Sequence, residues 1–503
     1  MEVNPPASDS HSELARLDLE CGVRRPAETS FFSGAKHFMI SGGEFTSITN
    51  LVTDAVSKDF CTIQLGNLDL HHEIRLHHES GVVTRVTNCT RKVYAARING
   101  TAADMTAIVY ELEEQWREDV MKYHNLRHPN IVQVYGTVSS GGFRATVLHG
   151  DLIPIRNFFK LYHDSALTIT YLHGYFSVAF LDAATYIRSV SHMRITSGSY
   201  TPWIRLSTGG LCIELTPCTA GQDLYPYTIS GDACRTPITL LGPDLESSII
   251  SSLSLHHYHE ICHWSFSRMH EYIVSPGIPV GLGGIVANLA YSGGTELLEI
   301  ASLPDCPIMD SGWKQQSGSA LGELVLSENG WTRIHYYSSH PSQSSKISRT
   351  FSIGEETGCS TCCWLSQSNS ILRRMDFMCN CSDIILVSSI HYELEITTDA
   401  CMEGYIFLCP FEHLRTKQSA QFQQPQVPAY WSTDPSGHES NTLDLVTSPG
   451  CLSMNFRMEV WGWSWDESVY AGLWKFHKGK GFDPSSRDIS VFLKLPLYHL
   501  HQS

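Results

Sequence analysis

Residues 111–137 read ELEEQWREDVMKYHNLRHPNIVQVYGT, and this stretch decides how the surrounding chain is interpreted. Its apolar residues recur at helical spacing with charged residues between them, which predicts one amphipathic helix: Leu112, Trp116, Val120 and Tyr123. Pro129 disfavours further helix because the residue before a proline is pushed out of the helical region. The β-branched and aromatic run of residues 131–135 predicts a buried strand that ends at Gly136.

The LRHPNIV corner of residues 126–132, with the helix before it and the strand after it, resembles the αC helix and fourth strand of the protein-kinase small lobe. The resemblance implies three earlier strands, a fifth strand, and then large-lobe helices and a hairpin. Asn99-Gly100 is the strongest turn signal among the early strands. The segments that fit are residues 82–86, 92–98 and 106–110 for the first three strands, 145–148 for the fifth, 158–162 and 167–190 for the helices, and 203–206 with 211–215 for the hairpin.

The residues that bind the phosphates in a protein kinase are missing at the matching positions of the small lobe. A kinase needs glycines in the first hairpin, a lysine on the third strand and a carboxylate on the helix. Here no glycine follows Gly81 in the hairpin, Tyr110 stands where the lysine would be, and Asp119 takes the place of the helix glutamate. We expect Tyr110 to pack on the helix near Trp116 or Tyr123 and to close the cleft.

The large lobe lacks its catalytic residues as well. The sequence offers HMR at residues 192–194 in place of HRD, with no asparagine after it, and LTP at residues 215–217 in place of the metal-binding DFG. The loss of base and metal ligands makes a degenerate, pseudokinase-type fold the preferred interpretation.

The composition is that of a globular chain of 503 residues, long enough for two to four domains. Its net charge of -16 argues against nucleic acid or an anionic membrane as a partner, since both attract basic surfaces. The polar N-terminus has no secretory pattern and no window is a good membrane span, so we expect an intracellular protein, cytoplasmic or nuclear. The sixteen cysteines are spread along the chain, which favours reduced thiols over a disulfide framework.

Several segments also resemble an uncharacterised group of fungal proteins, which pair a degenerate kinase-like part with a similar C-terminal part. The resemblance implies architecture only, because no activity is established for the group. The segments are FFSGAKHFMISGGEFTSI at residues 31–48, YIFLCP at 405–410, AYWSTDPSG at 429–437 and WDESVYAGLWKFHKGKGFDP at 465–484.

The predicted fold class is α+β, with a degenerate protein-kinase-like domain followed by a β-rich α/β C-terminal region. The predicted divisions are a disordered N-terminus over residues 1–30, a short β leader over 31–66, the kinase-like domain over 67–220, a linker over 221–245, and a β-rich C-terminal region with two terminal helices over 246–503.

The C-terminal tail has the clearest local pattern of this region. Three indoles alternate along a predicted strand and would share one face: Trp461, Trp463 and Trp465. Asp466 is predicted to cap a helix that runs through His477, and Asp-Pro at residues 483–484 to begin another through Leu495.

Two constellations could hold zinc. The string HEICH from His259 to His263 matches HExxH, in which two histidines of one helix bind zinc and the glutamate acts as base. Phe266 replaces the glycine of the longer zinc-protease motif, so a chance match in an aromatic helix is preferred. Two cysteine groups also lie at zinc-ribbon spacing, although free thiols are preferred: Cys359 and Cys362, then Cys379 and Cys381.

Three hypotheses follow from the sequence. The first is a non-catalytic, kinase-like interaction or regulatory protein with no cofactor and an unknown protein partner. The alternatives are an active atypical protein kinase that uses ATP and magnesium, and a zinc hydrolase centred on His259 and His263. No catalytic, cofactor-binding or metal-binding residue is assigned, and Tyr110 and Asp119 are treated as degenerate kinase positions.

Overall fold

The computed structural model describes residues 60–74, 91–196, 199–216, 234, 244–289, 297–304, 307–317, 320–339, 343–354, 359–374, 381–416, 421–437 and 452–501. Residues 1–53 and 54–503 form two units, and all the described residues belong to the second. The predicted disordered N-terminus, the strand at residues 82–86, and most of the predicted leader and linker lie outside the described residues. The described fold is α+β, as the sequence predicts.

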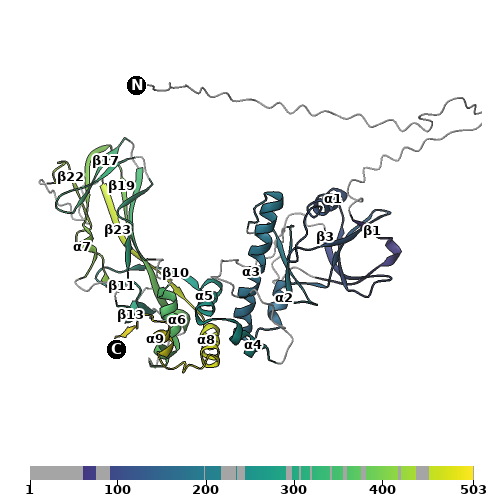
Figure 1. Ribbon diagram of the computed structural model, residues 1–503. Helices are drawn as coiled ribbons and strands as arrows, with labels where there is room; N and C mark the ends of the chain where they lie inside the picture. Colours follow the sequence, from purple (N-terminus) through teal and green to yellow (C-terminus); the bar gives the residue numbers. More distant parts are fainter. Residues whose placement is uncertain are drawn as a thin grey trace, which may run out of the picture. The chain divides into compact units, whose positions relative to one another are not determined.

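The first sheet of the described chain has six strands in the order β1-β5-β6-β4-β3-β2. β1 runs parallel to β5, and the other neighbours are antiparallel. Helix α1 (Glu113–Met121) joins β4 to β5 (Figure 1). It buries Trp116 and Val120 as the amphipathic pattern predicts, whereas Leu112 precedes the helix and is 56% exposed, and Tyr123 follows it. The strands are β1 (Cys61–Thr62), β2 (Leu68–Glu73), β3 (Arg91–Ile98), β4 (Met105–Tyr110), β5 (Val134–Ser140) and β6 (Phe143–His149).

Strand β5 differs from the strand predicted over residues 131–135. It begins at Val134 and continues through Gly136 to Ser140, so the prediction that the strand ends at Gly136 is wrong. Gly136 is paired with Cys61 of β1, and a Cβ atom there would collide with the Cys61 carbonyl oxygen. The glycine therefore permits a close approach of two backbones within the sheet.

A small three-stranded sheet and two helices follow. The sheet order is β7-β8-β9, and β8 and β9 form the predicted hairpin. The long helix begins after Ser165, whose side chain accepts a hydrogen bond from the Thr168 N–H, and ends at His192, which has a φ of 56°. The elements are β7 (Leu152–Pro154), β8 (Thr201–Arg205), β9 (Gly210–Glu214), α2 (Ile155–Lys160) and α3 (Ala166–Ser191).

The LRHPNIV corner is attached to strand β9. The Ile213 N–H donates to the Asn130 carbonyl oxygen at 2.9 Å, and the Val132 N–H donates to the Ile213 carbonyl oxygen at 3.0 Å. The Asn130 side chain also donates to the Leu211 carbonyl oxygen at 3.0 Å. These bonds satisfy the polar groups of a corner that lies between α1 and β5, and they hold β9 in place.

The C-terminal region forms two further large sheets. One has the path β10-β23-β19-β12-β13-β24, with β18 beside β19 and both β14 and β15 beside β18; the other has the order β16-β17-β20-β22, and β11 pairs with β21. The bounds of these strands are β10 (Arg268–Val274), β11 (Val280–Gly281), β12 (Ile285–Asn288), β13 (Leu297–Ser302), β14 (Ile308–Asp310), β15 (Lys314–Ser317), β16 (Leu321–Leu326), β17 (Thr332–Ser338), β18 (Gln343–Ile353), β19 (Ile384–Thr398), β20 (Met402–Leu408), β21 (Gln421–Phe422), β22 (Ala429–Ser432), β23 (Leu452–Ser464) and β24 (His499–Leu500).

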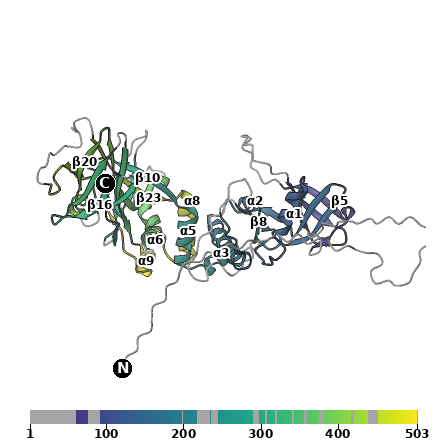
Figure 2. The same ribbon diagram turned by 90° about the horizontal axis from the view of Figure 1, so that it is seen from above.

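Helices cover part of the longer sheet. Leu386 of β19 belongs to the same hydrophobic core as helix residues Tyr258 and Leu473, whereas Tyr392 of β19 packs in a second core with Tyr336 of β17. Figure 2 shows α5, α6 and α8 near β10 and β23. The helices of this region are α4 (Leu245–Ser252), α5 (Leu255–Phe266), α6 (Cys359–Arg374), α7 (Phe411–Leu414), α8 (Glu467–Gly479) and α9 (Asp488–Phe492).

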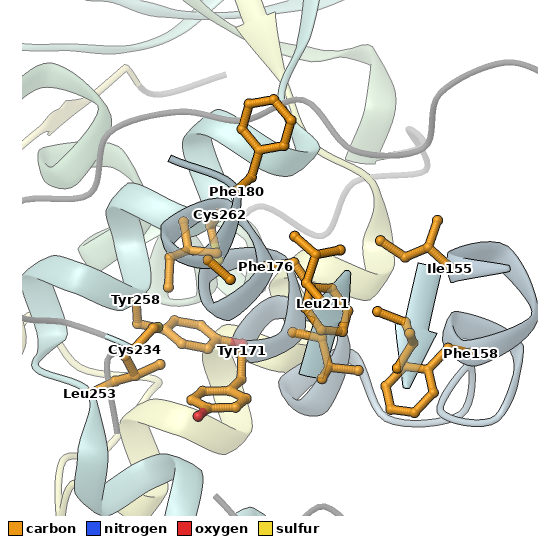
Figure 3. Packing of buried hydrophobic residues seen from close by; sticks show 14 of the residues in the cluster. Ile155, Phe158, Tyr171, Phe176, Phe180, Leu211, Cys234, Leu253, Tyr258 and Cys262 are labelled. Carbon is orange, nitrogen blue, oxygen red and sulfur yellow. The ribbon is translucent and has the colours of Figure 1, made fainter. Parts of the chain in front are cut away.

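Helix α3 packs closely against α5. A Cβ atom at Gly174 would lie 2.7 Å from Ile261 Cδ1 and 2.9 Å from Cys234 Sγ. Figure 3 shows Phe176 of α3 among apolar side chains that come from elements before and after residues 221–245, including Leu211 and Cys262. Residues before position 221 and residues after position 245 therefore belong to one hydrophobic core. The predicted domain division at residues 221–245 stays a prediction.

In the C-terminal tail, one of the predicted features is confirmed and two are wrong. Asp466 caps α8 by accepting hydrogen bonds from the N–H groups of Ser468 and Val469. Trp465 lies beyond the end of β23 and is fully buried, so the three indoles do not share one strand face. The helix predicted over residues 483–495 is shorter because the Asp483 carboxylate accepts from the Ser485 N–H at 2.9 Å in a turn, and α9 begins only at residue 488.

Candidate functional site

Tyr110 and Asp119, which the sequence analysis treats as degenerate kinase positions, lie in a buried polar cluster. We define this cluster as Arg91, Tyr110, Asp119, Tyr123, Trp203 and Glu214. Arg91 begins β3 and is the direct cross-strand partner of Tyr110, the last residue of β4. Asp119 belongs to α1, and Tyr123 follows that helix. Glu214 ends β9, and Trp203 lies on the neighbouring strand β8. The cluster therefore joins the first sheet, α1 and the β8–β9 hairpin.

An ion pair between Arg91 and Glu214 forms the centre of this cluster. The Arg91 Nη1 atom donates to Glu214 Oε1, and the two side chains are only 1% and 2% exposed. The other carboxylate oxygen, Oε2, accepts a hydrogen bond from Trp203 Nε1 at 2.8 Å. Both oxygens of the carboxylate are thus occupied by donors, which offsets the cost of burying its charge.

Tyr123 connects α1 to the backbone that follows β9. Its hydroxyl oxygen accepts a hydrogen bond from the Leu215 N–H at 2.8 Å, and the tyrosine is buried. Leu215 is the first residue of the LTP string, which the sequence analysis compares with DFG. The backbone that leaves β9 is therefore held by a phenol that follows α1.

The ionisation states within the cluster are set by burial and by its two carboxylates. Burial raises the pKa of Tyr110 well above its ordinary value, and Asp119 raises it further. Burial and the Glu214 carboxylate do the same to the pKa of Tyr123. Burial opposes the charge of Arg91, but Glu214 outweighs it and raises the pKa of the guanidinium above its ordinary value. At neutral pH both phenols are protonated and Arg91 is charged, so none of the three is a general base.

Tyr110 and Asp119 do not line an open cleft. Each is only 4% exposed, and Tyr110 belongs to the same hydrophobic core as Trp116 and Tyr123. Its packing directly on the helix stays a prediction. The Asp119 Oδ1 atom accepts from Lys122 Nζ at 2.7 Å, while its Oδ2 atom has no hydrogen-bond partner among the described residues. The carboxylate is paired with Lys122 at the end of the same helix. β4, on which the sequence analysis looks for the kinase lysine, ends in Tyr110 and contains no lysine.

The string HMR of residues 192–194 is exposed to solvent, unlike the buried cluster. His192 closes α3 in a left-handed conformation, and all three residues of the string are exposed. Among the described residues, no side-chain hydrogen bond or ion pair positions His192 as a base. Pro217 lies outside the described residues.

The two histidines of HEICH lie on α5, as the sequence predicts, but they point to different neighbours. His259 is fully buried, and its Nε2 atom lies 2.9 Å from His477 Nε2 of α8. His263 packs edge-on against Trp463, with the ring centroids 5.2 Å apart. Burial and His477 lower the pKa of His259 well below its ordinary value, and burial lowers that of His263 to about 4. Both are neutral at pH 7, with His259 fully buried and His263 partly buried.

The cysteine groups lie in different surroundings. Cys362 is buried in α6, with its Sγ atom 3.7 Å from His256 Nδ1, and Cys381 is half-buried in a short 3-10 turn. The side chain of Cys359 and all of Cys379 lie outside the described residues. Among the residues that are described, no group of three or more histidine, cysteine or acidic side chains is placed to hold a metal ion.

Comparison with known proteins gives no further guide to this chain. No family model matches it, and a search of curated proteins finds no match. Within the described residues, no helix combines the length and the apolar character needed to cross a membrane.

Two residues of the cluster escaped the sequence analysis: Arg91 and Glu214. Glu214 had a recognisable signal, because it is the single charge in the apolar run GLCIEL of residues 210–215. A carboxylate in a buried strand needs a partner. The partner could not be named, since Arg91 lies 123 residues earlier and the chain has 35 lysines and arginines.

Proposed function

We propose that this chain is a non-catalytic, kinase-like interaction or regulatory protein, whose degenerate kinase-like domain covers residues 67–220. The observation that carries the proposal is the buried Arg91–Glu214 pair. It fills with protein side chains the region in which the resemblance would put a lysine, a helix glutamate and a metal ligand.

The succession of elements supports the kinase-like part of the proposal. Strands β2, β3 and β4 are consecutive antiparallel neighbours, and α1 follows them. β5 and β6 then pair with each other, and β6 pairs with β4. The helix thus stands between the third and fourth strands of this series, which begins at β2 and not at the strand predicted over residues 82–86, a segment outside the described residues. The hairpin of β8 and β9 follows the long helix α3, as the resemblance implies for the large lobe.

The charges in the buried cluster support the non-catalytic part. Nucleotide phosphates need positive groups that face them in an accessible cleft. Arg91 is neutralised by Glu214, and the Lys122 ammonium by Asp119. Tyr110 presents a protonated phenol that is buried in the core. Bound phosphates would have to displace Glu214 and would then meet the charge of Asp119.

The test is the thermal stability of the full chain with and without 5 mM Mg-ATP. Binding at a hundred times the dissociation constant would add about 2.7 kcal/mol to the free energy of unfolding, which a melting curve resolves. We expect no shift with Mg-ATP or with adenosine, and no incorporation of labelled phosphate. An active protein kinase measured in parallel shows that the assay detects nucleotide.

An upward shift of several degrees with Mg-ATP that adenosine does not produce would contradict the proposal. So would phosphate incorporation that disappears in the Asp119→Ala variant, because it would give this carboxylate a role in phosphoryl transfer.

A further inference from the structure

Strand β10 is an edge strand of unusual regularity. All seven of its residues, from Arg268 to Val274, pair with β23 without a register shift. On its other side no strand of the described chain pairs with it. Its outer row of backbone N–H and C=O groups is therefore a template on which a further strand can pair.

The other edge strands of the described chain are short or irregular. Edge strands β2 and β16 have six residues each, but both carry a register shift. β9 has five residues and is almost wholly buried. The remaining edge strands have two to four residues each: β1, β7, β11, β14, β15, β21, β22 and β24. Short length and bulges are the devices by which proteins prevent unwanted edge pairing, and β10 shows neither.

The side chains of β10 present an apolar and an acidic surface on one face. Met269 and Ile273 are 56% and 57% exposed, and Glu271, which is also exposed, lies between them. Alternate residues of a strand share a face, so these three form one row. The other face is held in place, because His270 Nε2 is hydrogen-bonded to Ser464 Oγ at 2.8 Å and stacks on Tyr272. The strand is thus rigid where it presents its row.

The row indicates the chemistry of the strand that fits it. In an antiparallel pair, directly opposed residues interact, and like charges opposite each other destabilise the pair. A second copy that set Met269 against Ile273 would put Glu271 opposite Glu271 of that copy. A strand with apolar residues at both ends of the row and a lysine or arginine at its centre would satisfy all three positions. The net charge of -16 also favours a basic partner.

We propose that β10 binds an extended segment of a basic partner protein by strand addition, with the pattern apolar, any residue, lysine or arginine, any residue, apolar. This partner segment would serve the non-catalytic role proposed above, and the proposal rests on that role only because both assume that the chain acts by binding. Nucleotide binding does not involve β10, so the two proposals fail in separate experiments.

The test uses a fluorescein-labelled peptide, Ser-Thr-Ile-Thr-Lys-Thr-Val-Thr-Ser, titrated with the full chain and followed by fluorescence anisotropy. We expect saturable binding that Glu271→Lys weakens by about fivefold or more, since an attraction becomes a repulsion. A peptide with glutamate in place of its lysine should show the reverse preference and bind Glu271→Lys better than the native chain. N-methylation of the isoleucine and the valine should abolish binding, because the N–H groups of peptide residues that lie opposite Met269 and Ile273 donate to β10.

The matched control is Glu323→Lys, which reverses an exposed glutamate on the bulged edge strand β16 and should leave peptide binding unchanged. Far-UV circular dichroism and melting curves check that both variants fold. Absence of saturable binding, or equal affinity of the native chain and Glu271→Lys for the lysine peptide, would overturn the proposal. A dimer of the native chain that Met269→Asn dissociates would instead identify a second copy as the occupant and would equally refute a basic partner segment.

Discussion

Substitution of Glu214 by glutamine would isolate the energy of the buried ion pair. Glu214→Gln preserves the shape of the side chain and can keep an acceptor for Trp203 Nε1, but it leaves the Arg91 guanidinium charged and buried without a counter-ion. Removing one partner of a buried ion pair costs about 3–5 kcal/mol. The Arg91→Met variant should cost a similar amount, because it leaves the carboxylate uncompensated. The double variant removes both charges and should recover most of the loss.

The appropriate assay is native-state amide exchange of the full chain, supported by urea titration of tryptophan fluorescence. A chain of this length is not expected to unfold in one step, and exchange gives the free energy of opening for residues 91–98 and 210–214 separately. The control is Asp104→Asn, which breaks the exposed Arg97–Asp104 pair and should cost at most about 1 kcal/mol. If Glu214→Gln costs no more than Asp104→Asn, or if the losses of the two single variants add in the double variant, the reasoning fails.

Three further predictions concern the helical layer. Burial lowers the pKa values of His259, His263 and His477, those of His263 and His477 to about 4 and about 3. Because the unfolded histidines have a pKa of about 6.5, unfolding takes up protons below that pH. The free energy of unfolding should therefore fall as the pH falls from about 6.5 towards 4. Each histidine adds a slope of about 1.4 kcal/mol per pH unit, and urea midpoints at pH 7, 6 and 5 that do not change would contradict this. Asp466→Ala removes the cap of α8 and should cost about 0.5–2 kcal/mol, whereas Asp466→Asn should cost less, as thermal melts of the two variants can show. Gly174→Val should cost about 1–3 kcal/mol by overpacking α3 against α5, and an unchanged melting curve would show that Ile261 moves aside freely.

The sequence predicts the local elements of this fold well where the pattern is long and unbroken. The amphipathic spacing before Pro129 gives α1, and the apolar run of residues 167–190 gives α3. Failures occur where a residue has two possible meanings. Gly136 can end a strand or allow a second backbone to approach, and only the presence of β1 distinguishes the two. Asp483 can cap a helix or close a turn, and its bond to Ser485 decides for the turn.

The candidate site is less predictable, because its central contact joins residues far apart in the sequence. A motif is a set of residues at short, fixed spacing, and Tyr110 and Asp119 could be interpreted from the sequence because they stand close to the LRHPNIV corner in it. Arg91 and Glu214 belong to strands of different sheets, and their pairing follows from the way the LRHPNIV corner holds β9 beside the first sheet. A charge in an apolar strand therefore indicates that a partner exists, while the corner determines which one it is. In this chain the stretch that decides the fold also places the counter-ion that fills the site.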